Sequence, residues 1–215
     1  MQNEEYRYEA TSVAGVLQQL AACHLRDGYH FYVSGEVREG RDPFEVDRAI
    51  LSRYEVAISK YQRHRRKKKG LANLHYLRYR RRFLILATAG DHLFYRREVD
   101  IKDVRRIPIR FEGHSVGYRG RHASVRIEDQ VFRDLKAYFQ GIATARPAAV
   151  IGRELRGLPY VRFAPVRNQV YGLWKEVNRL RTAAGLDGVP RSYVEGGRKV
   201  CRPFEPATLD DDEVG

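Results

Sequence analysis

The feature that most constrains this chain is an interval without acids. No carboxylate lies between Glu55 and Asp91, although the 35 residues in between include eleven lysines and arginines. Cations on a helix are usually neutralised by carboxylates three or four positions away, and this interval offers none. The positive charges must therefore meet acids from distant segments, or an external anion such as a phosphate backbone. The eleven cations are Lys60, Arg63, Arg65, Arg66, Lys67, Lys68, Lys69, Arg78, Arg80, Arg81 and Arg82.

The chain as a whole is also strongly basic. Its 215 residues contain 40 Lys and Arg against 27 Asp and Glu, a formal net charge of +13. Five of the acids lie in the last eleven residues, so residues 1–204 carry 40 − 22 = +18. An excess of this size predicts a polyanionic partner, of which RNA or DNA is the commonest. The alternative is a protein that is merely soluble and rich in arginine.

The composition indicates a chain that folds in water. With 43% hydrophobic and 31% charged residues, it has enough apolar side chains for one sizeable core, or for one domain with a smaller appendage. No stretch approaches the roughly 18 apolar residues of a membrane span. The N-terminus lacks the basic-then-apolar pattern of a signal peptide. We therefore expect a cytoplasmic protein without a membrane partner, and the oligomeric state stays open.

Neither a cofactor nor a metal is expected. Cys23 and Cys201 are far apart and belong to no Cys-x-x-Cys pair, which leaves neither a disulfide framework nor a four-cysteine zinc site. The glycine-rich segment 113–126 matches neither a P-loop nor a dinucleotide fingerprint. The seven histidines never form a His-x-His pair, the metal-binding pair of rolling-circle initiators and single-strand transposases.

Cap signals and periodicity predict two helices and a strand in the first part of the chain. Apolar residues recur at helical spacing over 11–25, and alternation over 29–37 predicts a strand. Asp42 is a typical N-cap, with Pro43 at the first helical position and Glu45 placed to return the hydrogen bond. The helix that follows is expected to break near residues 54–56.

Beyond Gly70 the pattern favours strands. Residues 71–88 are rich in leucine and aromatic side chains without a cap signal, which predicts two strands joined near 80–82. Pro108 places its strand at a sheet edge, and Asp129 is expected to cap a helix. Further strands are expected over 93–95, 107–111, 115–118 and 123–127.

The order helix, strand, helix, several strands, helix predicts an α+β fold, with an antiparallel sheet covered by helices on one face. A ferredoxin-like arrangement is our first expectation within this class. Helical periodicity over 148–155 and 166–184 predicts a helical C-terminal appendage. The expected domains are an α+β nucleic-acid-binding domain over 1–145, the appendage over 146–204 and an acidic disordered tail over 205–215.

Two segments are candidates for contacting nucleic acid. In 60–82 aromatic residues are interleaved with the cations and offer flat faces to bases. In 113–126 three glycines expose backbone amides beside arginines and histidines, although a plain β-hairpin with glycines in its turn fits equally well. The expected binding residues are Lys60, Arg63, Arg65, Arg66, Lys67, Lys68, Lys69, Tyr76, Arg78, Tyr79, Arg80, Arg81, Arg82, Tyr118, Arg119, Arg121 and Arg126.

The alternative function is an endonuclease acting on RNA or single-stranded DNA. A metal-independent ribonuclease needs only a general base, a general acid and a cation beside the phosphorane, and His, Tyr and Arg can fill these roles. A nuclease with a tyrosine nucleophile would carry it on a helix, as expected for Tyr138. Each histidine alone is more often structural than catalytic. The catalytic candidates are His30, His75, His92, His114, His122 and Tyr138.

The leading hypothesis from the sequence is a basic nucleic-acid-binding protein that acts in mobile-element replication or RNA processing. A scaffold for ribosomal or other structured RNA fits the same charge. The chain shows neither an RNP aromatic motif nor a recognisable helix-turn-helix, so RNA and DNA stay alternatives.

Overall fold

The computed structural model describes residues 6–197 and 201–205, and its helices and strands form an α+β fold with two antiparallel sheets. The chain divides into two units. The first, here called the sheet unit, comprises the described residues up to 109 together with 117–123 and 201–205. The second, the helical unit, comprises 110–116 and 124–197. Beyond residue 205, the predicted acidic tail lies outside the described residues.

The first helix begins where the sequence predicts it and changes geometry halfway. The side chain of Ser12 caps α1 (Val13–Gln18) by accepting a 3.0 Å hydrogen bond from the Gly15 N–H. The chain then continues as a π-helix, η1 (Gln19–His24). No helix in the described part of the chain is both long and apolar enough to cross a membrane.

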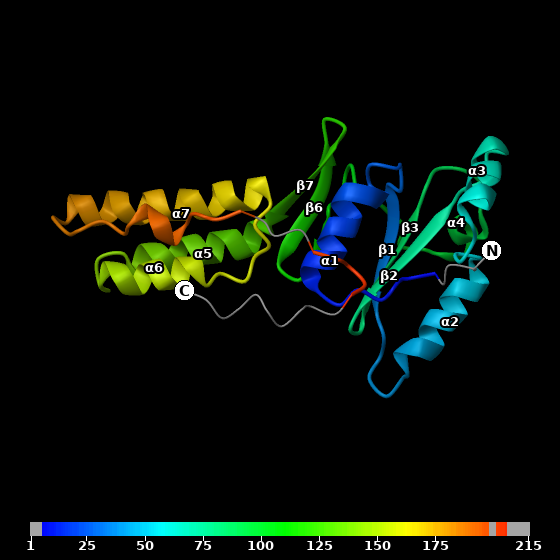
Figure 1. Ribbon diagram of the computed structural model, residues 1–215, viewed down its shortest axis with the longest axis horizontal. Coiled ribbons are helices and arrows are strands. Elements are labelled where there is room, and N and C mark those ends of the chain that lie inside the picture. The colour runs from blue at the N-terminus through cyan, green and yellow to red at the C-terminus, as the bar shows by residue number, and fades with distance from the viewer. Residues whose placement is uncertain (1–5, 198–200, 206–215) are drawn as a thin grey trace. The chain divides into compact units, whose positions relative to one another are not determined.

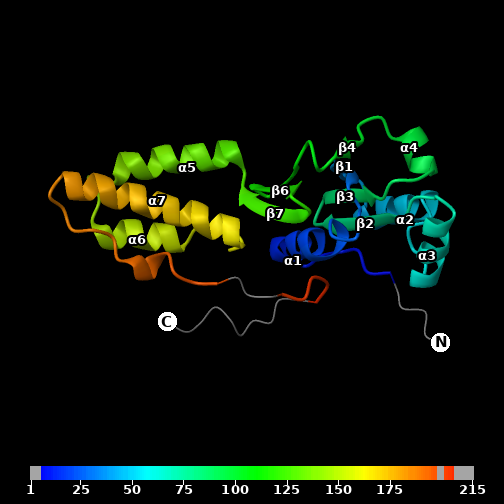
Figure 2. The same cartoon turned by 90° about the horizontal axis from the view of Figure 1, so that it is seen from above.

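The central sheet of the sheet unit has four strands in the order β2-β3-β1-β4, and every pairing is antiparallel. The predicted pair of strands over 71–88 is confirmed, with Arg80 at φ +54° in the turn between them. Figure 2 shows the short β4 beside β1. The ferredoxin-like arrangement stays a prediction, since β4 has only two residues. The strands are β1 (Phe31–Glu36), β2 (Leu74–Tyr79), β3 (Arg82–Ala87) and β4 (Lys102–Asp103).

Helices cover both faces of this sheet, so the expectation of one covered face was wrong. Four consecutive residues of β3, 84–87, are buried, which is typical of a strand packed on both sides. On one face His75 meets His24 of η1, and on the other Tyr76 bonds to Asp47 of α2 (Pro43–Arg53). Figure 1 shows α1 and α2 on opposite sides of the strands.

The exposed edge of β2 is covered by the N-terminal segment. The backbone of Arg78 accepts from the Ala10 N–H at 2.7 Å and donates to the Tyr8 carbonyl at 2.8 Å. Two residues earlier, the Tyr6 hydroxyl accepts from the Tyr76 N–H at 2.9 Å and donates to the Tyr76 carbonyl at 3.2 Å. The backbone groups that would otherwise face outward at these two residues are thus satisfied.

The N-cap of α2 was predicted from the sequence, whereas the N-cap of α4 was not. Asp42 caps α2 as predicted, because its carboxylate accepts from the Phe44 N–H at 3.0 Å. The strand expected over 93–95 was wrong, because α4 (Leu93–Arg97) is a short helix. Its cap is a histidine, His92, whose Nδ1 accepts from the Phe94 N–H at 3.1 Å. A three-residue apolar run fits a strand or a helix equally well, and an N-cap histidine is an uncommon start signal.

The second sheet has the order β5-β6-β7, and the boundary between the two units runs across it. Its edge strand β5 follows Pro108 directly, as the proline predicts. Both connections have two residues with positive φ, Glu112–Gly113 (+46°, +72°) and Gly120–Arg121 (+54°, +68°). This is the type I′ geometry that matches the twist of hairpin strands. The strands are β5 (Ile109–Phe111), β6 (His114–Arg119) and β7 (His122–Ile127).

The helical unit is built on α5 (Asp129–Ile142), α6 (Ala148–Arg156), α7 (Ala164–Ala183) and the 3₁₀ turn η2 (Arg191–Tyr193). Asp129 is the first residue of α5 and not its cap, which is Glu128. Although α5 falls within the α+β domain expected over 1–145, its residue Phe139 shares one core with Leu155 and Leu173 of the helical unit. Buried Arg181 closes this core by donating to the carbonyls of Ala143 and Arg146 at 2.7 and 2.8 Å, which satisfies groups left unpaired at the end of α5.

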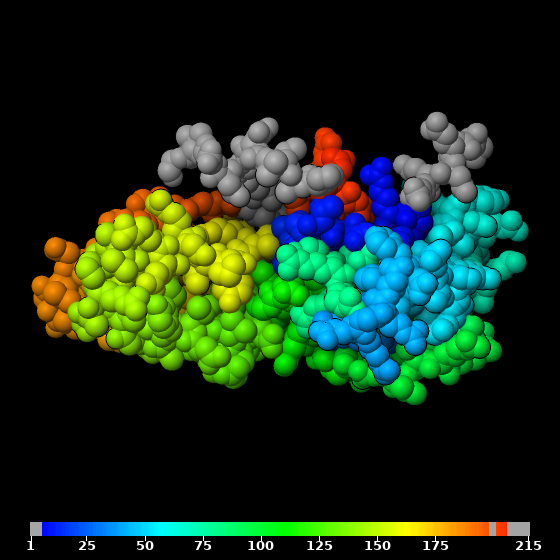
Figure 3. Space-filling model, turned by 90° about the horizontal axis from the view of Figure 1, so that it is seen from below, coloured from blue at the N-terminus to red at the C-terminus, as the bar shows by residue number. Residues whose placement is uncertain are grey.

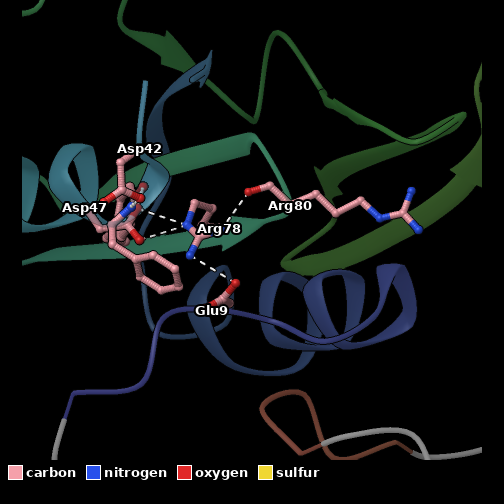
Figure 4. A network of polar contacts seen from close by, with 7 residues as sticks. Glu9, Asp42, Asp47, Arg78 and Arg80 are labelled. Carbon is pink, nitrogen blue, oxygen red and sulfur yellow. Dashed lines mark hydrogen bonds and ion pairs between the residues drawn. The ribbon is translucent and has the colours of Figure 1, made fainter. Parts of the chain in front are cut away.

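An ion pair inside the sheet unit fastens α2 to β2 (Figure 4). Asp47, fully buried, accepts from Arg78 Nε at 2.8 Å and from the Tyr76 hydroxyl at 2.5 Å. Burial raises the pKa of Tyr76, as does this carboxylate, so the phenol stays protonated as a donor. Arg78 also donates to the Arg80 carbonyl at 2.7 Å and lies 3.0 Å from Glu9. Buried charges are tolerated when they are paired in this way.

We predict that Asp47→Ala destabilises the protein far more than replacing the pair. Removing Asp47 leaves the buried Arg78 with only the half-exposed Glu9 as a counter-charge, and we expect a loss of about 3 kcal/mol in the free energy of unfolding, at the lower end for a broken buried pair. The control variant Asp47→Leu with Arg78→Met removes both charges and should lose less. Urea unfolding measures both. A loss for Asp47→Ala of about 0.5 kcal/mol, typical of a surface substitution, would contradict this account.

Candidate nucleic-acid interface

Helix α3 (Lys60–Lys68) is fastened to the sheet unit along one side only. Ser59 and Gln62 form a reciprocal capping box at its start. Arg63 donates from Nη2 to the Val56 carbonyl at 2.9 Å, and its own carbonyl accepts from Asn73 at 3.0 Å. One turn later Arg66 pairs with Glu55. Two of the eleven cations of the acid-free interval therefore serve to attach the helix.

The outward side of α3 carries cations without acids. Tyr61 is 69% exposed, and the Arg65 guanidinium lies 5.7 Å from the centre of its ring. Within residues 6–197 and 201–205, no ion pair is found for the lysines or for Arg65 on this side. Four basic residues lie in the last turn, where the helix dipole offsets part of their repulsion. We call this surface the cationic platform: Lys60, Tyr61, His64, Arg65, Lys67, Lys68 and Lys69, all exposed.

The platform lies at the periphery of the sheet unit. Figure 1 shows α3 beyond the strands, next to α4. In the space-filling view of Figure 3, the pale-blue and cyan segment that contains α2 and α3 covers part of the surface of this unit. A polyanion could reach the platform without any rearrangement of the sheet.

Of the remaining cations of the interval, one is buried in the sheet unit and others lie on its surface. Arg78 is 3% exposed and Tyr76 fully buried, so predicting them as surface contacts was wrong: both hold α2 on the sheet. Arg81 donates from Nε to the Val37 carbonyl at 2.9 Å. Arg80 is exposed and lies 5.1 Å from the ring centre of Tyr79.

The β6–β7 hairpin presents a second basic tip. Arg119, Arg121 and His122 are exposed there, and Arg126 is exposed farther along β7. Gly120 serves the turn, as in a plain hairpin, but Arg121 holds a left-handed conformation that arginine rarely adopts. The turn geometry explains the glycine at position 120, but among the described residues no contact of this turn explains the arginine at position 121.

Histidine 75 lies in an internal cluster that the sequence did not reveal. Its ring is 4.4 Å from that of His24, and its Nδ1 is 3.1 Å from the Tyr6 hydroxyl. Burial lowers the pKa of His24 to about 4 and, with His24 and Arg63 nearby, that of His75 to about 2. Burial also raises the pKa of Tyr6 to about 12. The partners are up to 69 residues apart in sequence, so no local pattern could predict them.

Two further catalytic candidates, His114 and His92, use their ring nitrogens in hydrogen bonds that hold the fold. His114 is buried, with Nδ1 2.8 Å from the Glu112 carbonyl and Nε2 accepting from the Val161 N–H at 3.1 Å. Burial lowers the pKa of His114, so the ring is a neutral link between two backbone segments. His92 caps α4, as described above.

His30 is the candidate that best retains a free chemical role. Its Nε2 lies 3.2 Å from the Leu25 carbonyl, which favours the tautomer with an unprotonated Nδ1. Its ring is 4.6 Å from that of Tyr118. Burial lowers the pKa of His30, and so does Arg105, which is paired with Asp103 at 2.6 Å. The imidazole is therefore neutral at pH 7.

The six catalytic candidates are divided between the two units. His30, His75, His92 and His122 belong to the sheet unit, whereas His114 and Tyr138 belong to the helical unit. The Tyr138 hydroxyl donates to Glu154 at 2.8 Å, and that carboxylate raises the pKa of the phenol. Among the described residues, no group of three or more His, Cys, Asp or Glu side chains is arranged to hold a metal ion.

Comparison with known protein families finds no matching family, and comparison with curated proteins finds no match to this chain.

The internal histidine cluster predicts loss of stability in mild acid. Both histidines have a lower pKa in the folded chain than the ordinary 6.5. Below pH 6.5 the unfolded chain therefore binds more protons than the folded chain, and the free energy of unfolding falls as the pH drops. Each histidine should cost about 2 kcal/mol at pH 5 relative to pH 7. Urea unfolding at the two pH values measures this. In the control variant His24→Leu with His75→Phe, the difference should shrink; an equally steep pH dependence would exclude these residues as its source.

Proposed function

We propose that this protein binds nucleic acid, RNA or DNA, through the cationic platform on α3. The observation that carries the proposal is the set of five exposed cations, Lys60, Arg65, Lys67, Lys68 and Lys69, without a carboxylate partner among the described residues. Holding such charges together is costly unless an anion covers them. A phosphate backbone is the anion that matches a row of cations and gains from the release of its own counterions.

The exposed aromatic ring in the platform supports the same function. Tyr61 stands among the cations with Arg65 against its face. Proteins that bind single strands combine backbone-tracking cations with aromatic rings on which bases stack. Arg80 and the β6–β7 tip, with Arg119 and Arg121, offer further cations on the sheet unit. Phosphate contacts of this type position a strand but do not select a sequence.

We predict that binding to single strands weakens steeply with salt. Five phosphate contacts give a slope of log K against log salt of about −3.5 for single strands. Replacing the five platform cations with Gln should lower affinity at least tenfold and flatten the slope, with thermal stability nearly unchanged because solvated cations contribute little to folding. Filter binding of a labelled 15-mer at several salt concentrations measures both quantities.

A charge-matched control separates the platform from the net charge. The variant Arg26→Gln, Arg96→Gln, Arg179→Gln, Arg191→Gln, Arg202→Gln also removes five cations, all of them paired with neighbouring acids. It should bind nearly as well as the unmodified protein. Equal weakening in the two variants would mean that overall charge, and not the platform, drives binding. A flat salt dependence would refute nucleic-acid binding altogether.

Cleavage of RNA is the second candidate function, favoured by the neutral His30 ring beside Tyr118 and Arg105. In such a reaction His30 Nδ1 takes the proton of a 2′-hydroxyl, the 2′ oxygen bonds to phosphorus, and the bond to the 5′ oxygen breaks. The Tyr118 hydroxyl would supply the proton to that leaving oxygen. The products are a 2′,3′-cyclic phosphate and a free 5′-hydroxyl.

This second candidate predicts cleavage that persists in EDTA, since His30 needs no metal to act as a base. Cleavage activity should rise with pH as His30 loses its proton. Because the pKa of His30 is lowered, this rise should occur at a lower pH than for an ordinary histidine. His30→Ala should abolish cleavage and leave binding intact, whereas the control Lys136→Ala, at an exposed position of α5 in the helical unit, should change neither. RNA that is bound and stays whole in EDTA, Mg²⁺ and Mn²⁺ would exclude the reaction.

A further inference from the structure

A groove of about 580 Å³ runs beside the cationic platform. It is bounded by the end of α2, by the connection to α3 and by α3 itself, all within the sheet unit. Its volume falls in the range of about 300–1,000 Å³ that is typical of small-ligand sites. Its lining includes Leu51, Ala57, Ile58, Arg65, Lys69 and Leu71.

The lining of the groove is divided by chemistry. Leu51, Ile58 and Leu71 supply an apolar surface, while Arg65 and Lys69 supply positive charge. These two cations also belong to the platform. A nucleotide has the complementary division, because its base has apolar faces and its phosphate is anionic. The groove therefore offers a binding surface for a base next to the platform cations that would bind the phosphate backbone.

The connection between α2 and α3, which forms one wall of the groove, is anchored in the core. Glu55, which lines it, holds a left-handed conformation at φ +46° and pairs with Arg66. On either side of Glu55, Tyr54 and Val56 are almost completely buried in the core beneath α2. A preformed site loses little conformational entropy on binding, which favours affinity.

We propose that this groove receives one unstacked nucleotide of the bound strand, with its base on the apolar surface and its phosphate at Arg65 and Lys69. The proposal rests on the proposed function. In a duplex the bases are stacked and paired, so none could enter without an unpairing cost. The groove thus makes the protein selective for single-stranded over double-stranded nucleic acid.

The test compares a single-stranded dA 15-mer with the same strand paired to dT 15-mer, by fluorescence anisotropy. The unmodified protein should bind the single strand about tenfold more tightly, as expected from one stacked base. Ala57→Trp fills the groove without changing charge and should remove this preference while leaving duplex affinity within about twofold. The matched control Ala137→Trp places the same ring at an exposed position of α5 in the helical unit.

A second variant and a second readout guard against a folding defect in Ala57→Trp. Ile58→Ala removes part of the apolar wall and should weaken single-strand binding severalfold. A single strand carrying 4-thiothymidine at its centre should photocrosslink within residues 51–71 of the unmodified protein. Equal affinity for single strand and duplex, with salt-dependent binding intact, would overturn this inference alone. Absence of salt-dependent binding to either probe would overturn the proposed function.

Discussion

The buried pair of Asp47 and Arg78 is the interaction on which the sheet unit depends. The only acids that can meet Arg78 come from distant segments, because its own interval holds none. Asp47 reaches it from α2, and Glu9 from the N-terminal segment. Pairing these residues fixes α2 across the sheet, which in turn positions the end of α2 beside α3. The groove and the orientation of the platform thus follow from one internal charge pair.

Within the acid-free interval, the cations that hold the fold are all arginines, whereas those that face outward include both the lysines and Arg65, Arg80 and Arg82. Arg63, Arg66, Arg78 and Arg81 all have fixed acceptors, two of them in carboxylates and two in backbone carbonyls. A guanidinium suits this role because its donors point in several fixed directions. The lysines of the interval, with one compact and strongly hydrated ammonium each, all stay exposed.

The sequence predicted what depends on local rules and missed what depends on distant contacts. Asp42 as a cap, Pro108 before an edge strand and the turn near Arg80 follow from short-range backbone chemistry, and the structure has all three. The burial of Tyr76 and Arg78 was missed because their partner Asp47 is about 30 residues away. The density of cations was visible in the sequence, but their division between core and surface required the fold. Of the groove, the sequence showed only its cations.

The way the N-terminal segment lies along β2 has a consequence for self-association. An uncovered outer strand offers its backbone to any other extended chain, including a second copy of the same protein. The backbone N–H and carbonyl of Arg78 bond to Tyr8 and Ala10, and those of Tyr76 both bond to the hydroxyl of Tyr6. At the opposite margin of the sheet, β4 is only two residues long. In the described part of the chain, both margins of this sheet therefore offer little free backbone to a further extended chain.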